Sequence, residues 1–190
     1  MRKVRAAVFA SGTGSNFQAI MDHHASLGCE IVLLVCDKQE AAVLEIANKF
    51  SVPTFTFDPK EYESKLAYEE KLVEKLHEAD VKWIFLAGYM RIVGETLLHA
   101  FEGRTINIHP SLLPKFPGKD AIGQAFESDV KTTGVTVHYI DAGIDTGPII
   151  VQEALEVLPT DTRDTLQKRI QEIEHRLYPQ VIKKLVRYAD

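Results

Sequence analysis

Residues 4–37 read VRAAVFASGTGSNFQAIMDHHASLGCEIVLLVCD and carry the pattern that decides the fold. Two apolar runs, 4–10 and 30–37, flank a Gly-rich turn at 11–16 and a segment with helical periodicity. The near-continuous apolar run at 30–37 is typical of a parallel strand that is buried on both faces. The stretch therefore predicts a strand–helix–strand unit whose helix ends at Gly28.

The same alternation continues along the rest of the chain. Further strands are expected at residues 52–58, 82–90, 104–110, 134–141 and 148–157. Helices are expected at residues 41–50, 60–79, 94–101, 121–128 and 160–188, the last one capped by Thr160 or Asp161. This pattern predicts an α/β fold with a doubly wound, mainly parallel sheet and an antiparallel edge strand. Ligands of such sheets bind outside the carboxyl ends of the strands.

The chain has 190 residues and an ordinary globular composition, with 45% hydrophobic and 26% charged residues. Its formal net charge of −5 argues against nucleic acids and anionic membranes as partners. No apolar run reaches the roughly 18 residues of a membrane-spanning helix. Cys29 and Cys36 form no C-x-x-C pair, which favours a reducing environment. We therefore expect a single cytoplasmic domain over residues 1–190.

The stretch INIHPSLLPKFPG, residues 106–118, places two polar residues on an otherwise apolar strand. Asn107 and His109 project from one face of this strand, because side chains alternate along it, while Ile106 and Ile108 project from the other. The prolines that follow exclude a helix or a central strand. The stretch is either a strand that presents two functional groups beside a rigid loop, or a strand with a packed core histidine and a surface turn.

The turn SGTGSN follows a strand and opens a helix, so its N–H groups can hold a phosphate. The predicted phosphate site comprises Gly12, Thr13, Gly14, Ser15 and Asn16. Phe17 stands where a dinucleotide fingerprint has its third glycine, so that motif is incomplete. Asp37 alone favours a dinucleotide, since an acid at the end of the second strand can bind ribose hydroxyls. Its alternative role is to form a turn before Lys38.

Three further polar features have both a functional and a structural interpretation. The segment DAGIDTGP, residues 141–148, can aim Asp141 or Asp145 into a cleft, or can be a surface hairpin. His138 is more typical of a packed histidine than of a catalyst, and Glu174 of a solvated helix face. The sequence shows no metal-ligand spacing and no G-x-S-x-G nucleophile motif, so a metal site is not expected.

Five motifs taken together resemble those of a known family. SGTGSN, LAGYMRIV, NIHPSLLPKFPG, GVTVHYIDAGIDTGPII and QEIEHRLYP occur in this order over nearly the whole chain. They are similar to the folate-dependent formyltransferases, and SGTGSN narrows the resemblance to the phosphoribosylglycinamide formyltransferase branch. The resemblance implies a Rossmann-like fold and transfer of a formyl group from 10-formyltetrahydrofolate to the amine of glycinamide ribonucleotide in purine biosynthesis. It also implies small-molecule partners, no metal, and a monomer or homodimer.

The resemblance assigns the catalytic positions to Asn107, His109 and Asp145. Asn107 and His109 are expected to stabilise a tetrahedral oxyanion, and Asp145 to orient or charge the histidine and to assist proton transfer. It further implies that the Gly12–Asn16 turn holds the substrate phosphate and that Glu174 holds its amine or ribose, with His138 in support. The expected folate-binding residues are Lys65, Met90, Arg91, Ile92, Val93, Asn107, Asp141 and Asp145. Many members have a histidine near Asp120, and whether Asp120 replaces it is open.

Two alternatives to this function remain at the level of the sequence. A formyltetrahydrofolate hydrolase would use the same donor, but a water acceptor gives no reason for the phosphate turn, and such enzymes usually carry an added regulatory domain. A dinucleotide-binding module would account for Asp37 but leaves Asn107, His109 and Asp145 unexplained. Methionyl-tRNA formyltransferases carry a further domain, for which 190 residues are expected to leave no room.

Overall fold

The computed structural model describes residues 3–188, and its centre is a seven-stranded sheet with the order β3-β2-β1-β4-β5-β6-β7. The strands are β1 (Val4–Ala10), β2 (Cys29–Cys36), β3 (Thr54–Thr56), β4 (Trp83–Leu86), β5 (Thr105–His109), β6 (Thr132–Tyr139) and β7 (Ile149–Glu156). Strands β1 to β5 pair in parallel, whereas β6 is antiparallel to both β5 and β7. The doubly wound sheet with an antiparallel edge is therefore confirmed, and the reversal of direction begins at β6.

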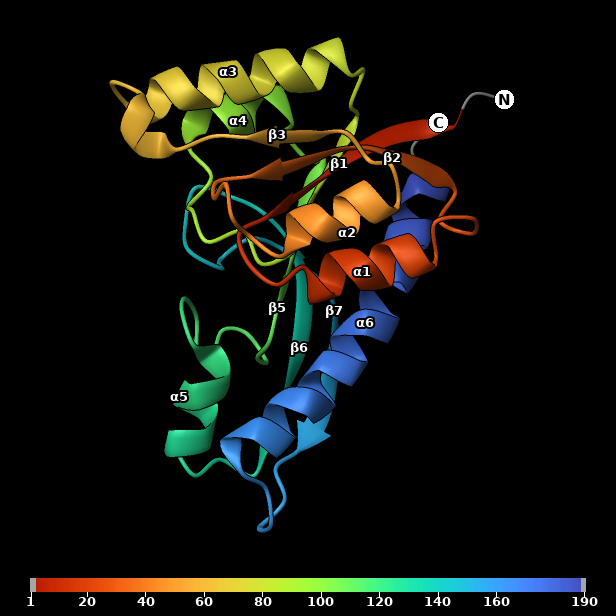
Figure 1. Cartoon of the computed structure of the whole chain (residues 1–190). Helices are drawn as coiled ribbons and strands as arrows, with labels where there is room; N and C mark the ends of the chain where they lie inside the picture. Colours follow the sequence, from red (N-terminus) through yellow and green to blue (C-terminus); the bar gives the residue numbers. More distant parts are fainter. Residues whose placement is uncertain (1–2, 189–190) are drawn as a thin grey trace.

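Helices cover both faces of this sheet (Figure 1). They are α1 (Ser15–Asp22), α2 (Val43–Lys49), α3 (Lys65–Glu78), α4 (Glu95–Ala100), α5 (Ala121–Glu127) and α6 (Arg163–Arg187), with a 3-10 turn, η1, at Pro59–Glu61. One hydrophobic cluster joins the sheet to α1, α2 and α6, and a second cluster joins it to α3 and α4. The sheet is thus buried on both faces, which is why β4 and, apart from the exposed Glu30, β2 are apolar.

Several helix ends differ from the sequence prediction. The helix expected at 60–79 begins only at Lys65, after η1. The first helix ends at Asp22 rather than Gly28, because His23 and His24 turn their Nδ1 atoms back to the carbonyls of Ala19 and Met21. Gly28 does have a left-handed φ of 85°, but it directly precedes β2.

The last helix is capped by Thr162, not by Thr160 or Asp161. Thr162 and Thr165 exchange side-chain to backbone hydrogen bonds in a capping box. Asp161 instead accepts hydrogen bonds from Leu158 N and from Arg169.

The strand order brings three strand ends together. The order changes direction between β1 and β4, and this is where doubly wound sheets bind their ligands. Across the next pairs, Leu86 of β4 lies beside Asn107 of β5, and Asn107 lies beside His138 of β6. Tyr178 of α6 is fully buried beneath this point and donates its hydroxyl to the carbonyl of Leu86, at 2.8 Å.

Replacing Tyr178 by Phe tests whether this buried hydrogen bond stabilises the strand ends. We expect a loss of about 1–2 kcal/mol in the free energy of unfolding, because a buried carbonyl loses its partner while the ring packing is retained. Urea denaturation measures this loss. Tyr188→Phe, at a residue that is 83% exposed, is the matched control and should change stability by less than about 0.5 kcal/mol. Equal stability of the two variants would contradict the assignment.

Candidate active site

Asn107, His109 and Asp145 come together at the end of β5. The histidine is buried, and its Nδ1 lies 3.6 Å from Asp145 Oδ2. Asp145 has a φ of 55°, which is uncommon for a residue with a side chain, and its Oδ2 accepts a hydrogen bond of 2.7 Å from Gly118 N. The left-handed backbone therefore aims the carboxylate into the site and away from solvent.

The Pro-rich loop fixes the orientation of the His109 ring. His109 Nε2 lies 2.8 Å from the carbonyl of Phe116. Because a carbonyl can only accept, Nε2 carries the proton, and Nδ1 is the nitrogen directed at Asp145. Phe116 has a left-handed φ of 55°. The loop that leaves β5 therefore turns back, and the Phe116 carbonyl lies beside His109 of that strand. The loop thus selects the histidine tautomer.

His138 fixes the orientation of the Asn107 amide in a similar way. His138 Nδ1 donates to the carbonyl of Tyr139 at 2.9 Å, so its Nε2 is the acceptor in the neutral ring. That Nε2 lies 3.4 Å from Asn107 Nδ2 and 3.7 Å from Asp145 Oδ1. Burial lowers the pKa of His138, which keeps the ring neutral. One amide N–H of Asn107 is therefore held, and the other is free for a ligand.

The predicted phosphate turn has the geometry of an anion site. Gly14 is the N-cap of α1 with a left-handed φ of 78°, and an added Cβ would lie 2.6 Å from a methyl group of Val43. Only glycine fits there. Ser15 and Asn16 form the first turn of α1, where backbone N–H groups lack partners within the helix and the helix dipole is positive.

Glu174 lies beside this turn and is only 6% exposed, so its interpretation as part of a solvated helix face is wrong. Burial raises its pKa to about 7, and a hydrogen bond from the Asn16 side chain opposes this rise. Asn16 Oδ1 is itself buried without a partner within residues 3–188. A carboxylate and an amide oxygen beside the anion site suit the hydroxyl or amine groups of a phosphorylated ligand.

The loop of residues 88–94, between β4 and α4, carries four of the eight predicted folate residues. Met90 and Ile92 are 60% and 52% exposed, whereas Val93 is buried. Ile140, which precedes the 141–146 loop, packs against the same hydrophobic cluster as Val93. Exposed apolar side chains on a loop are typical of a binding surface for an apolar ligand.

Two other predicted folate positions, Asp141 and Lys65, lie outside the 88–94 loop. Asp141 accepts hydrogen bonds from Gly143 N and Thr146 Oγ1, which lower its pKa and close the 141–146 loop. Lys65 is exposed at the start of α3, beside Gly94.

Asp120 does not join the catalytic cluster. It is the N-cap of α5, where it accepts from Gly123 N, and it pairs with Arg163 of α6.

Sequence reasoning missed the groups that hold the site together. Two of them, the Phe116 carbonyl and the Gly118 N–H, are backbone atoms, which have no sequence signature. Thr136 and Gln152 support the same loop, since Thr136 donates to the Ser111 carbonyl and Gln152 donates to the Leu113 carbonyl. The alternation of side chains along β6 and β7 could be read from the sequence, but the loop carbonyls that Thr136 and Gln152 bind could not.

Metal sites and membrane spans were both assessed over residues 3–188 of the chain only, the part that the structure describes. No group of three or more His, Cys, Asp and Glu side chains in this part of the chain could hold a metal ion. Over the same residues, no helix has the length and apolar character needed to cross a membrane.

The fold is that of a doubly wound α/β protein, and comparison with known proteins identifies the family. A model of the formyl transferase family matches residues 4–182, so the chain belongs to the formyl transferase family. Over 182 residues it is 54% identical to the phosphoribosylglycinamide formyltransferase of Bacillus subtilis, which covers 95% of this chain and 93% of that protein. It is also 40% identical to the trifunctional purine biosynthetic protein adenosine-3 of Drosophila melanogaster, but it spans only 14% of that protein.

Solved structures agree with this assignment. The crystal structure of phosphoribosylglycinamide formyltransferase from Bacillus halodurans superposes with a TM-score of 0.95 at 52% identity, covering 98% of this chain and 97% of that one. Glycinamide ribonucleotide transformylase 1 from Geobacillus kaustophilus gives a TM-score of 0.95 at 51% identity, covering 97% of this chain and 100% of that one.

The buried Glu174 carboxylate predicts a specific pH dependence of stability. Its pKa of about 7 in the folded chain exceeds the ordinary value of 4.5, so its contribution to stability is full below about pH 4.5 and is lost as the pH rises through 7. At pH 8 the Glu174→Gln variant should be more stable than wild type by up to about 3 kcal/mol, and this gain should vanish near pH 4.5.

Chemical denaturation between pH 4.5 and 8 measures this difference. Glu172→Gln, an exposed position on the same helix, is the control and should follow wild type at every pH. A constant offset between wild type and Glu174→Gln across this range would contradict the burial argument.

Proposed function

We propose that this chain transfers the formyl group of 10-formyltetrahydrofolate to the free amine of glycinamide ribonucleotide, a step of de novo purine biosynthesis. The observation that carries the proposal is the meeting of two features at one sheet edge. A cluster of Asn107, His109 and Asp145 ends β5, and an anion-binding turn opens α1 beside Glu174. The similarity to the Bacillus subtilis phosphoribosylglycinamide formyltransferase over nearly the full chain supports the same reaction.

The reaction begins when the amine attacks the formyl carbon and a tetrahedral oxyanion forms. The free amide N–H of Asn107 donates to this oxygen, because His138 holds the other one. An oxyanion donor of this kind contributes roughly 10²–10³ in rate. The carbon–nitrogen bond to the folate then breaks, the amine loses one proton, and the folate nitrogen gains one. No covalent enzyme intermediate and no metal are needed for these steps.

His109 and Asp145 handle the proton in this proposal. His109 Nε2 is committed to the Phe116 carbonyl, so only Nδ1 can donate to the oxyanion or exchange a proton with the substrate. Its separation of 3.6 Å from Asp145 Oδ2 exceeds a hydrogen bond and leaves Nδ1 accessible to a substrate atom or a water. The carboxylate stabilises the charged ring when Nδ1 is protonated. General acid–base assistance of this kind contributes roughly 10²–10⁴ in rate.

Segments that follow β1 and β4, next to this centre, hold the two substrates in this proposal. The N–H groups of the Gly12–Asn16 turn bind the ribonucleotide phosphate, and Glu174 binds its amine or ribose hydroxyls. Met90, Ile92 and Val93 form the wall of the folate pocket. The cations of Arg91 and Lys65 suit the carboxylates of the folate glutamate tail, although Lys65 is equally consistent with a solvated helix residue.

The alternatives account for fewer of these observations. A hydrolase has no use for a phosphate turn with a buried Glu174 beside it. A dinucleotide-binding module needs the Asp37 carboxylate free to bind ribose, but that carboxylate is buried and paired with Arg91 at 2.8 Å. Cys29 and Cys36 are both free and buried, which supports our proposal of a cytoplasmic location. A monomer or homodimer is the proposed assembly.

The choice of acceptor tests the function. With 10-formyltetrahydrofolate followed by absorbance, we expect rapid consumption with glycinamide ribonucleotide and less than about 1% of that rate without an acceptor. The dephosphorylated riboside should react with a KM that is higher by about 100-fold or more, because it loses the charge-assisted contacts to the turn. Equal consumption without an acceptor would indicate the hydrolase. Equal use of riboside and ribonucleotide would contradict the assigned phosphate site.

A further inference from the structure

Two buried carboxylates, neither of them part of the catalytic cluster, bind the loop of residues 88–94. Asp37, at the end of β2, accepts a hydrogen bond of 2.8 Å from Arg91 Nε. Glu69, on α3, accepts one of 2.8 Å from Gly94 N. They are 5% and 3% exposed. Carboxylates are rarely buried to this degree unless a partner holds them, so both contacts need an explanation.

The pair of Asp37 and Arg91 is asymmetric. The Asp37 side chain is 2% exposed and the Arg91 side chain is 38% exposed, so the arginine reaches from a buried acid towards solvent. Asp37 Oδ1 is buried and lacks a hydrogen-bond partner among the described residues. The acid therefore depends on Arg91 for its charge compensation, whereas Arg91 uses only Nε and keeps its four Nη hydrogens for another acceptor.

We propose that Asp37 is a positioning residue that fixes the Arg91 guanidinium as a receptor for the carboxylates of the folate glutamate tail. A planar guanidinium recognises a carboxylate through two parallel hydrogen bonds, and this requires a fixed orientation. Anchoring Nε to a buried acid supplies that orientation before the ligand arrives. The inference deepens the proposed function and rests on it, because it assumes that the 88–94 loop binds folate.

Glu69 supports the same loop from the other side. Gly94 is the N-cap of α4, and an added Cβ there would lie 2.3 Å from Glu69 Oε1, so the loop and α3 pack closely. Burial raises the pKa of Tyr68, and the charges of Glu69 and Asp37 raise it further while Arg91 lowers it. These groups therefore share one poorly solvated environment in which a fixed charge pair is effective.

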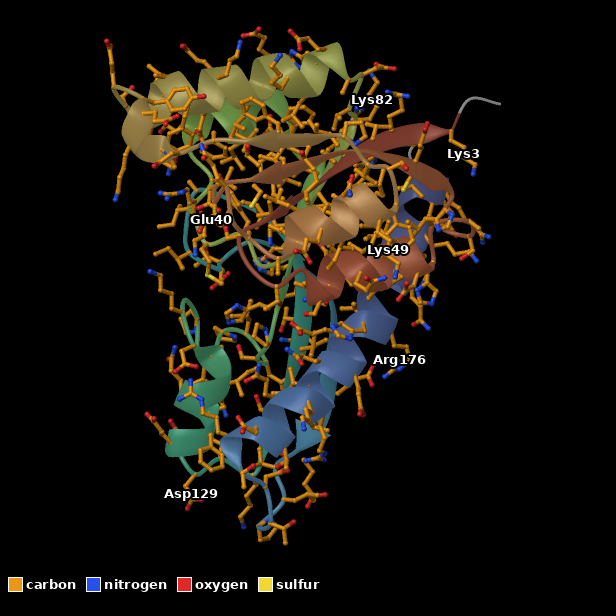
Figure 2. The ribbon with its side chains drawn as sticks, in the orientation of Figure 1. Lys3, Glu40, Lys49, Lys82, Asp129 and Arg176 are labelled. Carbon is orange, nitrogen blue, oxygen red and sulfur yellow. The ribbon has the colours of Figure 1, made fainter. Side chains whose placement is uncertain are left out.

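The test separates folate binding from chemistry. Asp37→Asn should raise the KM for 10-formyltetrahydrofolate by roughly 5- to 20-fold, because an oriented, charge-assisted contact is lost. We expect kcat and the KM for glycinamide ribonucleotide to change by less than about twofold. Glu40→Gln is the matched control, since it removes one negative charge from the exposed turn after β2 (Figure 2), and it should leave all three constants unchanged.

A double-variant comparison distinguishes positioning through Arg91 from a purely structural role. In an Arg91→Gln background, Asp37→Asn should change the folate KM by less than about 1.5-fold further, because the group it positions is already absent. With 10-formyltetrahydropteroate, which lacks the glutamate, wild type and Asp37→Asn should have the same KM. Additive effects, or an equal effect with the truncated donor, would overturn the proposal.

A second variant keeps the test decisive if Asp37→Asn does not fold. Arg91→Lys retains the exposed cation. A single ammonium group cannot bind Asp37 and also present two parallel N–H groups to a carboxylate, so the KM for 10-formyltetrahydrofolate should rise as it does for Asp37→Asn. A wild-type KM for Arg91→Lys would overturn the inference. Failure of the proposed function is distinguishable, because in that case wild type itself would not formylate glycinamide ribonucleotide.

Discussion

The geometry of the active site depends on the Asp145 carboxylate. Its Oδ2 accepts from Gly118 N and faces His109, and its Oδ1 faces His138, so one side chain joins β5, β6 and the Pro-rich loop. The antiparallel pairing of β5 with β6 makes this possible, because it sets His138 beside Asn107. The chain after β6 then turns back at a left-handed Asp145. Without this carboxylate, His109 and His138 would lose the side chain that both of them face.

The sheet order places the two proposed substrate-binding segments next to each other, on the β4 side of β5. The phosphate turn follows β1 and the folate loop follows β4, the two strands between which the strand order reverses. Ser11 links them directly, since its N–H donates to the Gly88 carbonyl and its Oγ accepts from Met90 N. The segments proposed to bind the ribonucleotide and the folate are thus joined by hydrogen bonds. Proximity of this kind accounts for a large part of catalysis in bimolecular transfers.

Much of this arrangement could be predicted from the sequence, for identifiable reasons. Apolar runs and Gly-rich turns predicted the strands and the sheet, because burial on both faces leaves a plain local pattern. Same-face projection correctly paired Asn107 with His109. The meeting of both residues with Asp145 followed from the family resemblance and not from spacing, since 36 residues of chain separate His109 from Asp145.

Other features depend on contacts that no local pattern encodes. Glu174 has charged sequence neighbours, yet α6 packs its carboxylate against α1 and buries it. Asp37 resembles a turn former, but its partner is Arg91, 54 positions later. The tautomer of His109 is set by a backbone carbonyl. In each case a long-range contact overrides the local preference of the residue.

The most direct test of the account is the single-turnover rate of formyl transfer in Asp145→Asn with both substrates saturating. Asparagine keeps the size of the side chain and an acceptor for Gly118 N, but it removes the charge that stabilises protonated His109. The account predicts that the rate falls by roughly 10²–10⁴, while the dissociation constants of both substrates change only a few-fold. A rate within about threefold of wild type, in a normally folded variant, would contradict the role assigned to this carboxylate.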